Sequence, residues 1–183
     1  MRLFIPVIIG TTRPKRQSIK VAHYLKGQLA DRENVTTQLV DPTDYDLTLD
    51  GNDQENKIGA YSELIERADG LMIVVPEYNH SFPGSLKSLL DKELGAYFRK
   101  PAAIAGVSGG GFGGVRAIES LVPVLRELGM VVSSIDMPVP KVAEAFNEEG
   151  GPIDERIQQQ AGTTIEELVW LAHTLKAGRN QEK

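Results

Sequence analysis

Cysteine is absent from the 183 residues of this chain, and histidine is scarce. Without cysteine, the chain cannot form disulfides, use a thiolate nucleophile or build a Cys-based zinc site. Its three histidines, His23, His80 and His173, are too few and too scattered to predict a metal cluster. We therefore expect neither a bound metal ion nor a thiol-dependent reaction.

Long apolar runs are missing as well. No stretch approaches the roughly 20 apolar residues that a membrane-spanning helix needs. The apolar start, Met1 to Ile9, leads at once into a polar loop with Arg13, and no small-residue cleavage site follows it. We interpret this start as a core strand rather than a secretory signal. The sequence predicts a cytoplasmic protein that has no membrane partner.

An excess of basic residues is also absent. Twenty Lys and Arg residues stand against 25 Asp and Glu residues, which gives a formal net charge of −5. Nucleic-acid-binding proteins normally present a strongly basic face, so we expect no nucleic-acid partner. The cations that stand out are local, because Arg13, Lys15 and Arg16 fall within four residues of one another.

What the chain does contain is a regular alternation of apolar runs and segments with helical periodicity. The apolar runs predict strands near residues 2–9, 35–41, 70–76, 102–107 and 130–138. The periodic segments predict helices near residues 17–30, 57–68, 84–93, 114–128 and 153–177. Such alternation is typical of βαβ units and a parallel sheet.

The length predicts one domain over residues 1–183, with a frayed tail at 178–183. Five strands, each followed by a helix, match a flavodoxin-like α/β fold. This fold is a three-layer sandwich around a five-stranded parallel sheet in the order 2-1-3-4-5. Ligands of open α/β sheets bind outside the carboxyl ends of the strands. We therefore expect the site at the loops that follow the first, third and fourth strands.

Residues 10–18, which follow the first strand, offer the groups that a phosphate needs. Backbone N–H groups and the macrodipole at a helix start favour an anion. Thr11, Thr12 and Ser18 add hydroxyl donors, and Arg13 and Arg16 add positive charge. The loop predicts a phosphate site, with a plain turn carrying solvated cations as the alternative. It is not a nucleotide-triphosphate loop, because Gly-x-x-x-x-Gly-Lys-Ser/Thr does not occur there.

A Gly-x-Gly-x-x-Gly pattern occurs at residues 109–114, between the fourth strand and its helix. This pattern leaves a Rossmann-type dinucleotide site open as an alternative. The position of the pattern argues against this alternative, because the usual fingerprint opens the first βα unit. Glycines at this place also let backbone amides approach a flat ring edge closely.

The most informative segment is residues 76–87, PEYNHSFPGSLK, where an apolar strand runs into a polar, proline-flanked loop. It resembles the Pro-Glu-Tyr-Asn and Pro-Gly-x-Leu-Lys motifs of the NADPH-dependent FMN reductase family. Residues 108–117 resemble the third loop of the same family, and residues 10–13 stand for its Gly-Ser-x-Arg. The likeness covers about residues 2–177, and the family is flavodoxin-like, with chromate-, azo- and quinone-reducing members.

The resemblance implies bound FMN, with NADPH or NADH as the hydride donor. It places the FMN phosphate on Thr11, Thr12, Arg13, Gln17 and Ser18. It places the ribityl chain and ring against Pro76, Glu77, Tyr78, Asn79 and His80. The pyrimidine edge would then face Ser108, Gly109 and Gly110. One departure is Arg16, since many family members have a small residue there.

From these features we predict an FMN-dependent NAD(P)H oxidoreductase. It would pass hydride from NAD(P)H through FMN to a quinone, an azo compound, free flavin or a metal oxyanion. No catalytic side chain is expected, because the flavin performs the chemistry. Tyr78, His80 and Phe112 are expected to line the substrate face. The alternative is that Tyr78 and Phe112 pack a subunit interface, since the resemblance implies a homodimer or homotetramer.

Two other functions stay open at this point. A non-enzymatic electron carrier of flavodoxin type would bind FMN in a similar way. A nucleotide-binding regulator would use the glycine-rich loop at residues 109–114 instead.

Overall fold

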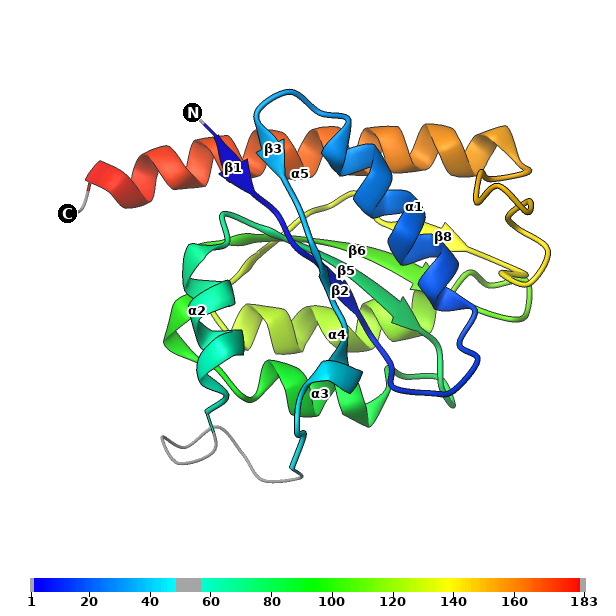
Figure 1. Ribbon diagram of the computed structural model, residues 1–183, viewed down its shortest axis with the longest axis horizontal. Coiled ribbons are helices and arrows are strands. Elements are labelled where there is room, and N and C mark those ends of the chain that lie inside the picture. The colour runs from blue at the N-terminus through cyan, green and yellow to red at the C-terminus, as the bar shows by residue number, and fades with distance from the viewer. Residues whose placement is uncertain (1, 49–56, 182–183) are drawn as a thin grey trace.

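The computed structural model describes residues 2–48 and 57–181, which form a parallel β-sheet with helices on both faces (Figure 1). The strands are β1 (Leu3–Phe4), β2 (Val7–Ile9), β3 (Val35–Thr36), β4 (Leu39–Val40), β5 (Leu71–Pro76), β6 (Pro101–Val107), β7 (Val131–Val132) and β8 (Met137–Val139). The helices are α1 (Ser18–Ala30), α2 (Gly59–Arg67), α3 (Gly84–Leu90), α4 (Val115–Glu127) and α5 (Glu155–Gln181). Two short 3-10 helices are η1 (Pro42–Asp44) and η3 (Gly95–Tyr97).

The strand pairings of the described residues are parallel and give the order β4-β2-β5-β6-β7, with β8 also paired to β6. β1 pairs with β3 in a second, two-stranded ladder. β1 with β2, β3 with β4, and β7 with β8 each form one interrupted strand. Counted in this way, the strands follow the order 2-1-3-4-5 that the sequence led us to expect.

The interruptions are the main departure from the predicted strands. The first strand breaks at Ile5 and Pro6, because proline has no backbone N–H to donate to a ladder. The last strand breaks between Val132 and Met137. There, the Ser133 hydroxyl accepts a 3.1 Å hydrogen bond from the backbone N–H of Ile135 and bends the chain. An apolar run alone carries no sign of such a local bend.

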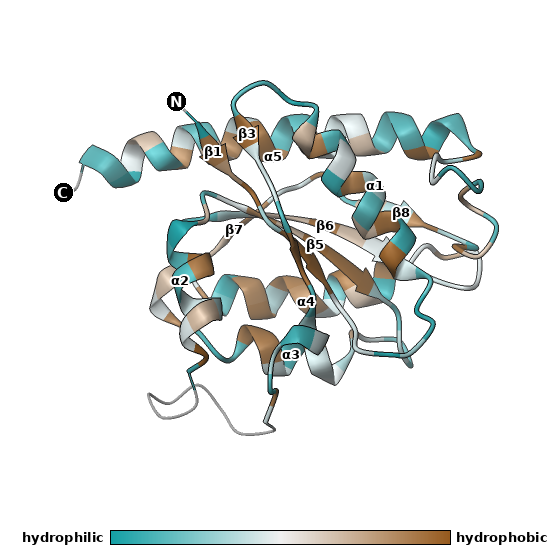
Figure 2. Cartoon of the chain, in the orientation of Figure 1, coloured by the Kyte–Doolittle hydropathy of each residue, from teal (hydrophilic) through white to brown (hydrophobic). Residues whose placement is uncertain are grey.

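The core lies on both faces of the sheet, as Figure 2 shows by the apolar colour of the central strands. Successive side chains of a strand point to opposite faces. Met72 and Val74 of β5 therefore pack with α1 and α5, whereas Ile73 and Val75 pack with α2, α3 and α4. A strand that is buried on both faces reads as a continuous apolar run, which is why the sequence predicted β5 and β6 well.

Helix α5 is longer than predicted and runs past the sheet toward the C-terminus (Figure 1). Its last turns are anchored to the segments that precede β5 and β6, because the Lys176 ammonium lies 2.8 Å from a carboxylate oxygen of Asp69. Arg179 adds a 2.7 Å hydrogen bond to the carbonyl of Arg99. Residues 178–181 of the expected frayed tail are thus helical, and residues 182–183 lie outside the described part of the chain.

Within residues 2–48 and 57–181, no helix combines the length and the apolar character needed to cross a bilayer.

Candidate functional site

The loops that follow β2, β5 and β6 meet at the carboxyl edge of the sheet and enclose a cavity of about 370 Å³. A volume of this size is typical of small-molecule sites. Nine of the predicted site residues line it, namely Thr11, Arg13, Gln17, Ser18, Pro76, Glu77, Tyr78, Ser108 and Gly109. Its other lining residues are Pro14, Lys15, Arg16, Val107 and Val142. The predicted residues Thr12, Asn79, His80 and Gly110 are not part of this lining.

One end of the cavity is the N-terminus of α1. Gln17 precedes the helix, and its side chain makes no capping hydrogen bond within the described residues. Ser18 is buried, and its hydroxyl has no hydrogen-bond partner in the part of the chain that the structure describes. A buried hydroxyl without a partner at an uncapped helix start is a donor set suited to an anion.

Arg16 has a different role from the one its charge suggested. Its side chain is only 12% exposed and forms an ion pair with Asp41, which opens η1. It also donates a 3.1 Å hydrogen bond to the carbonyl of Thr11. Arg16 therefore ties the loop after β2 to the end of the neighbouring strand. The cations left at the cavity mouth are Arg13 and Lys15, both exposed.

Thr12 faces a shallow depression of about 410 Å³ beside the cavity, together with Arg13, Ile19 and Thr43. The two hollows share the segment Arg13 to Arg16. The loop after β2 thus presents its polar groups to two adjoining surfaces.

The loop after β5 contains a tight two-residue turn. Two backbone hydrogen bonds of 2.8 and 3.0 Å join Tyr78 and Ser81, while Asn79 and His80 have φ values of 49° and 67°. Positive φ at both central residues is the signature of the type I′ hairpin turn. The side chains of Tyr78 and His80 diverge at this turn, because Tyr78 hydrogen-bonds Thr11 at 2.9 Å whereas His80 contacts Arg116.

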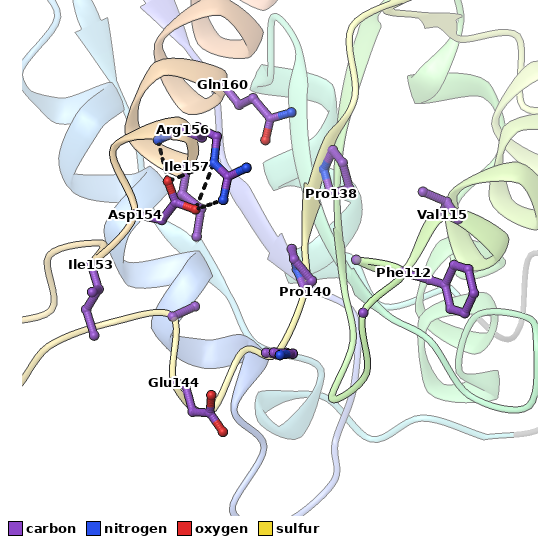
Figure 3. Close-up of a pocket in the computed structure, with 14 residues that line it drawn as sticks. Phe112, Val115, Pro138, Pro140, Glu144, Ile153, Asp154, Arg156, Ile157 and Gln160 are labelled. Carbon is purple, nitrogen blue, oxygen red and sulfur yellow. Dashed lines mark hydrogen bonds and ion pairs between the residues drawn. The ribbon is translucent and has the colours of Figure 1, made fainter.

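The glycine-rich loop after β6 is closed by its own serine. The Ser108 hydroxyl donates to the carbonyl of Gly110 and accepts from the N–H of Gly113, both at 2.9 Å. On its far side, this loop borders a second pocket of about 600 Å³, to which Phe112, Pro138 and Ile153 contribute (Figure 3). Tyr78 lines the cavity and Phe112 lines this second pocket, so the side chains expected on one substrate face are divided between two surfaces.

Sequence comparison agrees with this geometry. The sequence profile described as NADPH-dependent FMN reductase matches residues 4–143. The chain belongs to this family. The match to the NADPH-dependent FMN reductase family spans all three loops around the cavity and confirms the resemblance seen in their motifs.

Several relatives of this FMN reductase are similar over most of their length. The NAD(P)H-dependent FMN reductase LOT6 of Saccharomyces cerevisiae is 27% identical over 97% of this chain and 99% of the yeast protein. A 2-hydroxy-1,4-benzoquinone reductase of a Burkholderia species is 34% identical over 72% of this chain and 75% of the relative. The solved structure of FerB, a flavoenzyme NAD(P)H:(acceptor) oxidoreductase from Paracoccus denitrificans, superposes with a TM-score of 0.73. That superposition covers 92% of this chain and 97% of FerB at 24% identity.

These findings confirm the predicted flavodoxin-like α/β fold and the prediction of an FMN-dependent NAD(P)H oxidoreductase. They favour the reductase over the electron carrier. They also favour the reductase over the nucleotide-binding regulator, because the chain belongs to an FMN reductase family and its glycine-rich loop follows the fourth strand rather than the first.

Sequence reasoning missed one residue that lines the cavity and the partner of another lining residue. Val142 reaches it from the segment after β8, far from the three motifs, and no local pattern marked it. Arg116 does not line the cavity but pairs with Glu77, which does. Its place in the third-loop motif at residues 108–117 was visible, but its partner, 39 positions earlier, was not.

Proposed function

We propose that this reductase uses FMN held in the cavity to transfer electrons from NAD(P)H to a small oxidant, such as a quinone, an azo compound, free flavin or a metal oxyanion. The observation that carries the placement is the buried Ser18 hydroxyl at the start of α1, which has no hydrogen-bond partner within residues 2–48 and 57–181. The choice of oxidants is supported by relatives described as an NADPH azoreductase of a Bacillus species and a quinone reductase of Pseudomonas putida.

The residues around the cavity divide into two groups. Thr11, Arg13, Gln17 and Ser18 would bind the phosphate, with Thr12 reaching it from the adjoining depression. The second group would hold the ribityl chain and ring, and comprises Pro76, Glu77, Tyr78, Asn79, His80, Ser108, Gly109 and Gly110. When bound, FMN supplies the redox chemistry, so the chain's task is to bind and orient it and to leave one ring face accessible.

The test is a spectrum of the purified protein followed by anaerobic addition of NADPH, and of NADH in parallel. We expect flavin absorbance that bleaches rapidly with at least one of the two donors. A yellow protein whose spectrum stays unchanged with both donors would instead behave as an electron carrier. A colourless protein that FMN cannot reconstitute would rule out the proposed site.

Arg13→Ala should weaken FMN binding by about ten- to 150-fold. The reason is the loss of a charge-assisted contact to phosphate, worth roughly 1.5–3 kcal/mol. The measurement is a fluorescence titration of the apoprotein with FMN. Arg32→Ala is the matched control, because Arg32 is exposed just past the opposite end of α1. Equal FMN affinity in the two variants would remove Arg13 from the phosphate site.

We further propose that the reductase is a cytoplasmic homodimer or homotetramer with no nucleic-acid partner. Large apolar side chains on its surface support an assembly, because Leu94 and Phe98, at either end of η3, are 48% and 58% exposed. Sedimentation of the purified protein tests the proposed assembly state. A monomer at micromolar concentration would contradict it.

A further inference from the structure

Three groups from two of the cavity loops converge on one guanidinium. Arg116 lies in the first turn of α4 and pairs with a carboxylate oxygen of Glu77 at 2.6 Å. Another of its nitrogens lies 2.9 Å from Nε2 of His80. Its guanidinium carbon is 4.9 Å from the centre of the Phe112 ring. Arg116 therefore links the turn after β5 to the glycine-rich loop after β6.

Glu77 is the member of this group that faces the cavity. Its side chain is only 8% exposed, and it lines the cavity next to Pro76 and Tyr78. Arg116 pairs with Oε1, whereas Oε2 is buried with no hydrogen-bond partner among the described residues. Buried polar atoms are nearly always hydrogen-bonded, and leaving a charged acceptor unsatisfied is costly. An unpartnered carboxylate oxygen in a ligand cavity thus indicates a place for a donor from the ligand.

The chemistry of the cofactor narrows the choice of donor. FMN carries O–H donors on its ribityl chain and one N–H on the pyrimidine part of the ring, whereas its phosphate would be repelled by a carboxylate. The phosphate is expected at Ser18, so the middle or the ring end of the cofactor would meet Glu77. A carboxylate accepts from either donor in a charge-assisted bond.

We propose that Arg116 is a positioning residue, which holds Glu77 so that Oε2 accepts a hydrogen bond from an O–H or N–H of FMN. This inference rests on the proposed function. Arg116 would not touch the cofactor and acts through Glu77. The ion pair with Arg116 offsets the cost of burying the carboxylate, because burying an unpaired charge is costly.

The same guanidinium fixes the neighbouring turn. A guanidinium only donates hydrogen bonds, so Nε2 of His80 accepts from Arg116. The Ser120 hydroxyl donates a 3.4 Å hydrogen bond to the carbonyl of His80 and adds a second tie to α4. A change at Arg116 is therefore transmitted to both the Glu77 carboxylate and the turn.

The test uses Glu77→Gln, Arg116→Met and the double variant, each titrated as apoprotein with FMN by fluorescence. We expect each single change to weaken FMN about ten-fold or more, since each disturbs the charge-assisted acceptor. The double variant should bind FMN no more weakly than the single variant with the lower FMN affinity, because both changes remove one shared interaction. Arg126→Met is the control, since Arg126 is exposed on the same helix.

The midpoint potential of the bound FMN gives a second readout. Reduction adds negative charge to the flavin, so removing the Glu77 carboxylate should raise the potential and removing the Arg116 cation should lower it. General damage to the fold would not shift the potential in opposite directions. If Arg116→Met does not fold, Arg116→Lys keeps the charge without the planar fork and should still weaken FMN.

Two results would overturn the inference. One is a double variant whose loss of FMN affinity equals the product of the two single losses. The other is an FMN affinity of Glu77→Gln equal to that of the unchanged protein. Either result would leave the proposed function standing as long as the unchanged protein binds FMN. Failure of the unchanged protein to bind FMN would contradict the proposed function itself.

Discussion

Gly114→Ala is expected to lower the free energy of unfolding by about 3 kcal/mol or more. Gly114 precedes α4 with φ at +80°, where a residue with a side chain costs roughly 1–3 kcal/mol. A Cβ atom at this position would lie 2.4 Å from the backbone nitrogen of Val107 and 2.8 Å from the carbonyl carbon of Gly106. Both atoms belong to β6, which is paired on both sides. The strand cannot move away without breaking hydrogen bonds to a neighbouring strand.

The measurement is urea unfolding followed by circular dichroism, with FMN affinity as a second readout. FMN affinity should also fall, because Gly114 directs the chain into the helix that carries Arg116. Gly111→Ala is the matched control in the same loop, since a Cβ atom there would meet no atom of the described part of the chain within 4 Å. Equal urea midpoints for the two variants would show that the loop adapts to a side chain at position 114.

The layers of the fold could be predicted from the sequence because the patterns that mark them, apolar runs and apolar helix stripes, each lie within a short stretch of the chain. β5 and β6 are buried on both faces and stand out as apolar runs, while the helices between them keep one apolar stripe. The breaks in the outer strands could not be predicted in the same way. They depend on Pro6 within an otherwise regular strand and on a hydrogen bond that Ser133 makes two residues along the chain.

The candidate site was predictable where residues close in sequence stay close in space. Gln17 and Ser18 follow from a helix start, and Glu77 and Tyr78 follow from a strand end. Roles that depend on partners far along the chain were not predictable. Arg16 pairs with Asp41, 25 positions away, so its charge is already used within the fold.

Glu93→Gln should destabilise the protein by about 3 kcal/mol at pH 7. The Glu93 side chain is 3% exposed and pairs with Lys57 at 3.1 Å. It also accepts a 2.7 Å hydrogen bond from the N–H of Leu94 and a 3.4 Å bond from that of Ala96. Burial alone would raise the pKa of Glu93, but the hydrogen bonds to its carboxylate outweigh burial and lower the pKa from 4.5 to about 2. This difference corresponds to about 3 kcal/mol of stability held by the ionised form.

The sign of the pH dependence follows from this lowered pKa. Below pH 4.5, Glu93 becomes protonated in the unfolded chain but stays ionised in the folded protein. Stability is therefore lost as the pH falls toward 2. Glutamine imitates the protonated carboxyl group, so the variant should lack this part of the pH dependence and converge with the unchanged protein near pH 2. Urea unfolding at pH values from 7 to 3 measures the gap, with Glu63→Gln as the control because Glu63 is exposed on α2. A gap that stays constant across this range would mean that Glu93 acts through its shape rather than its charge.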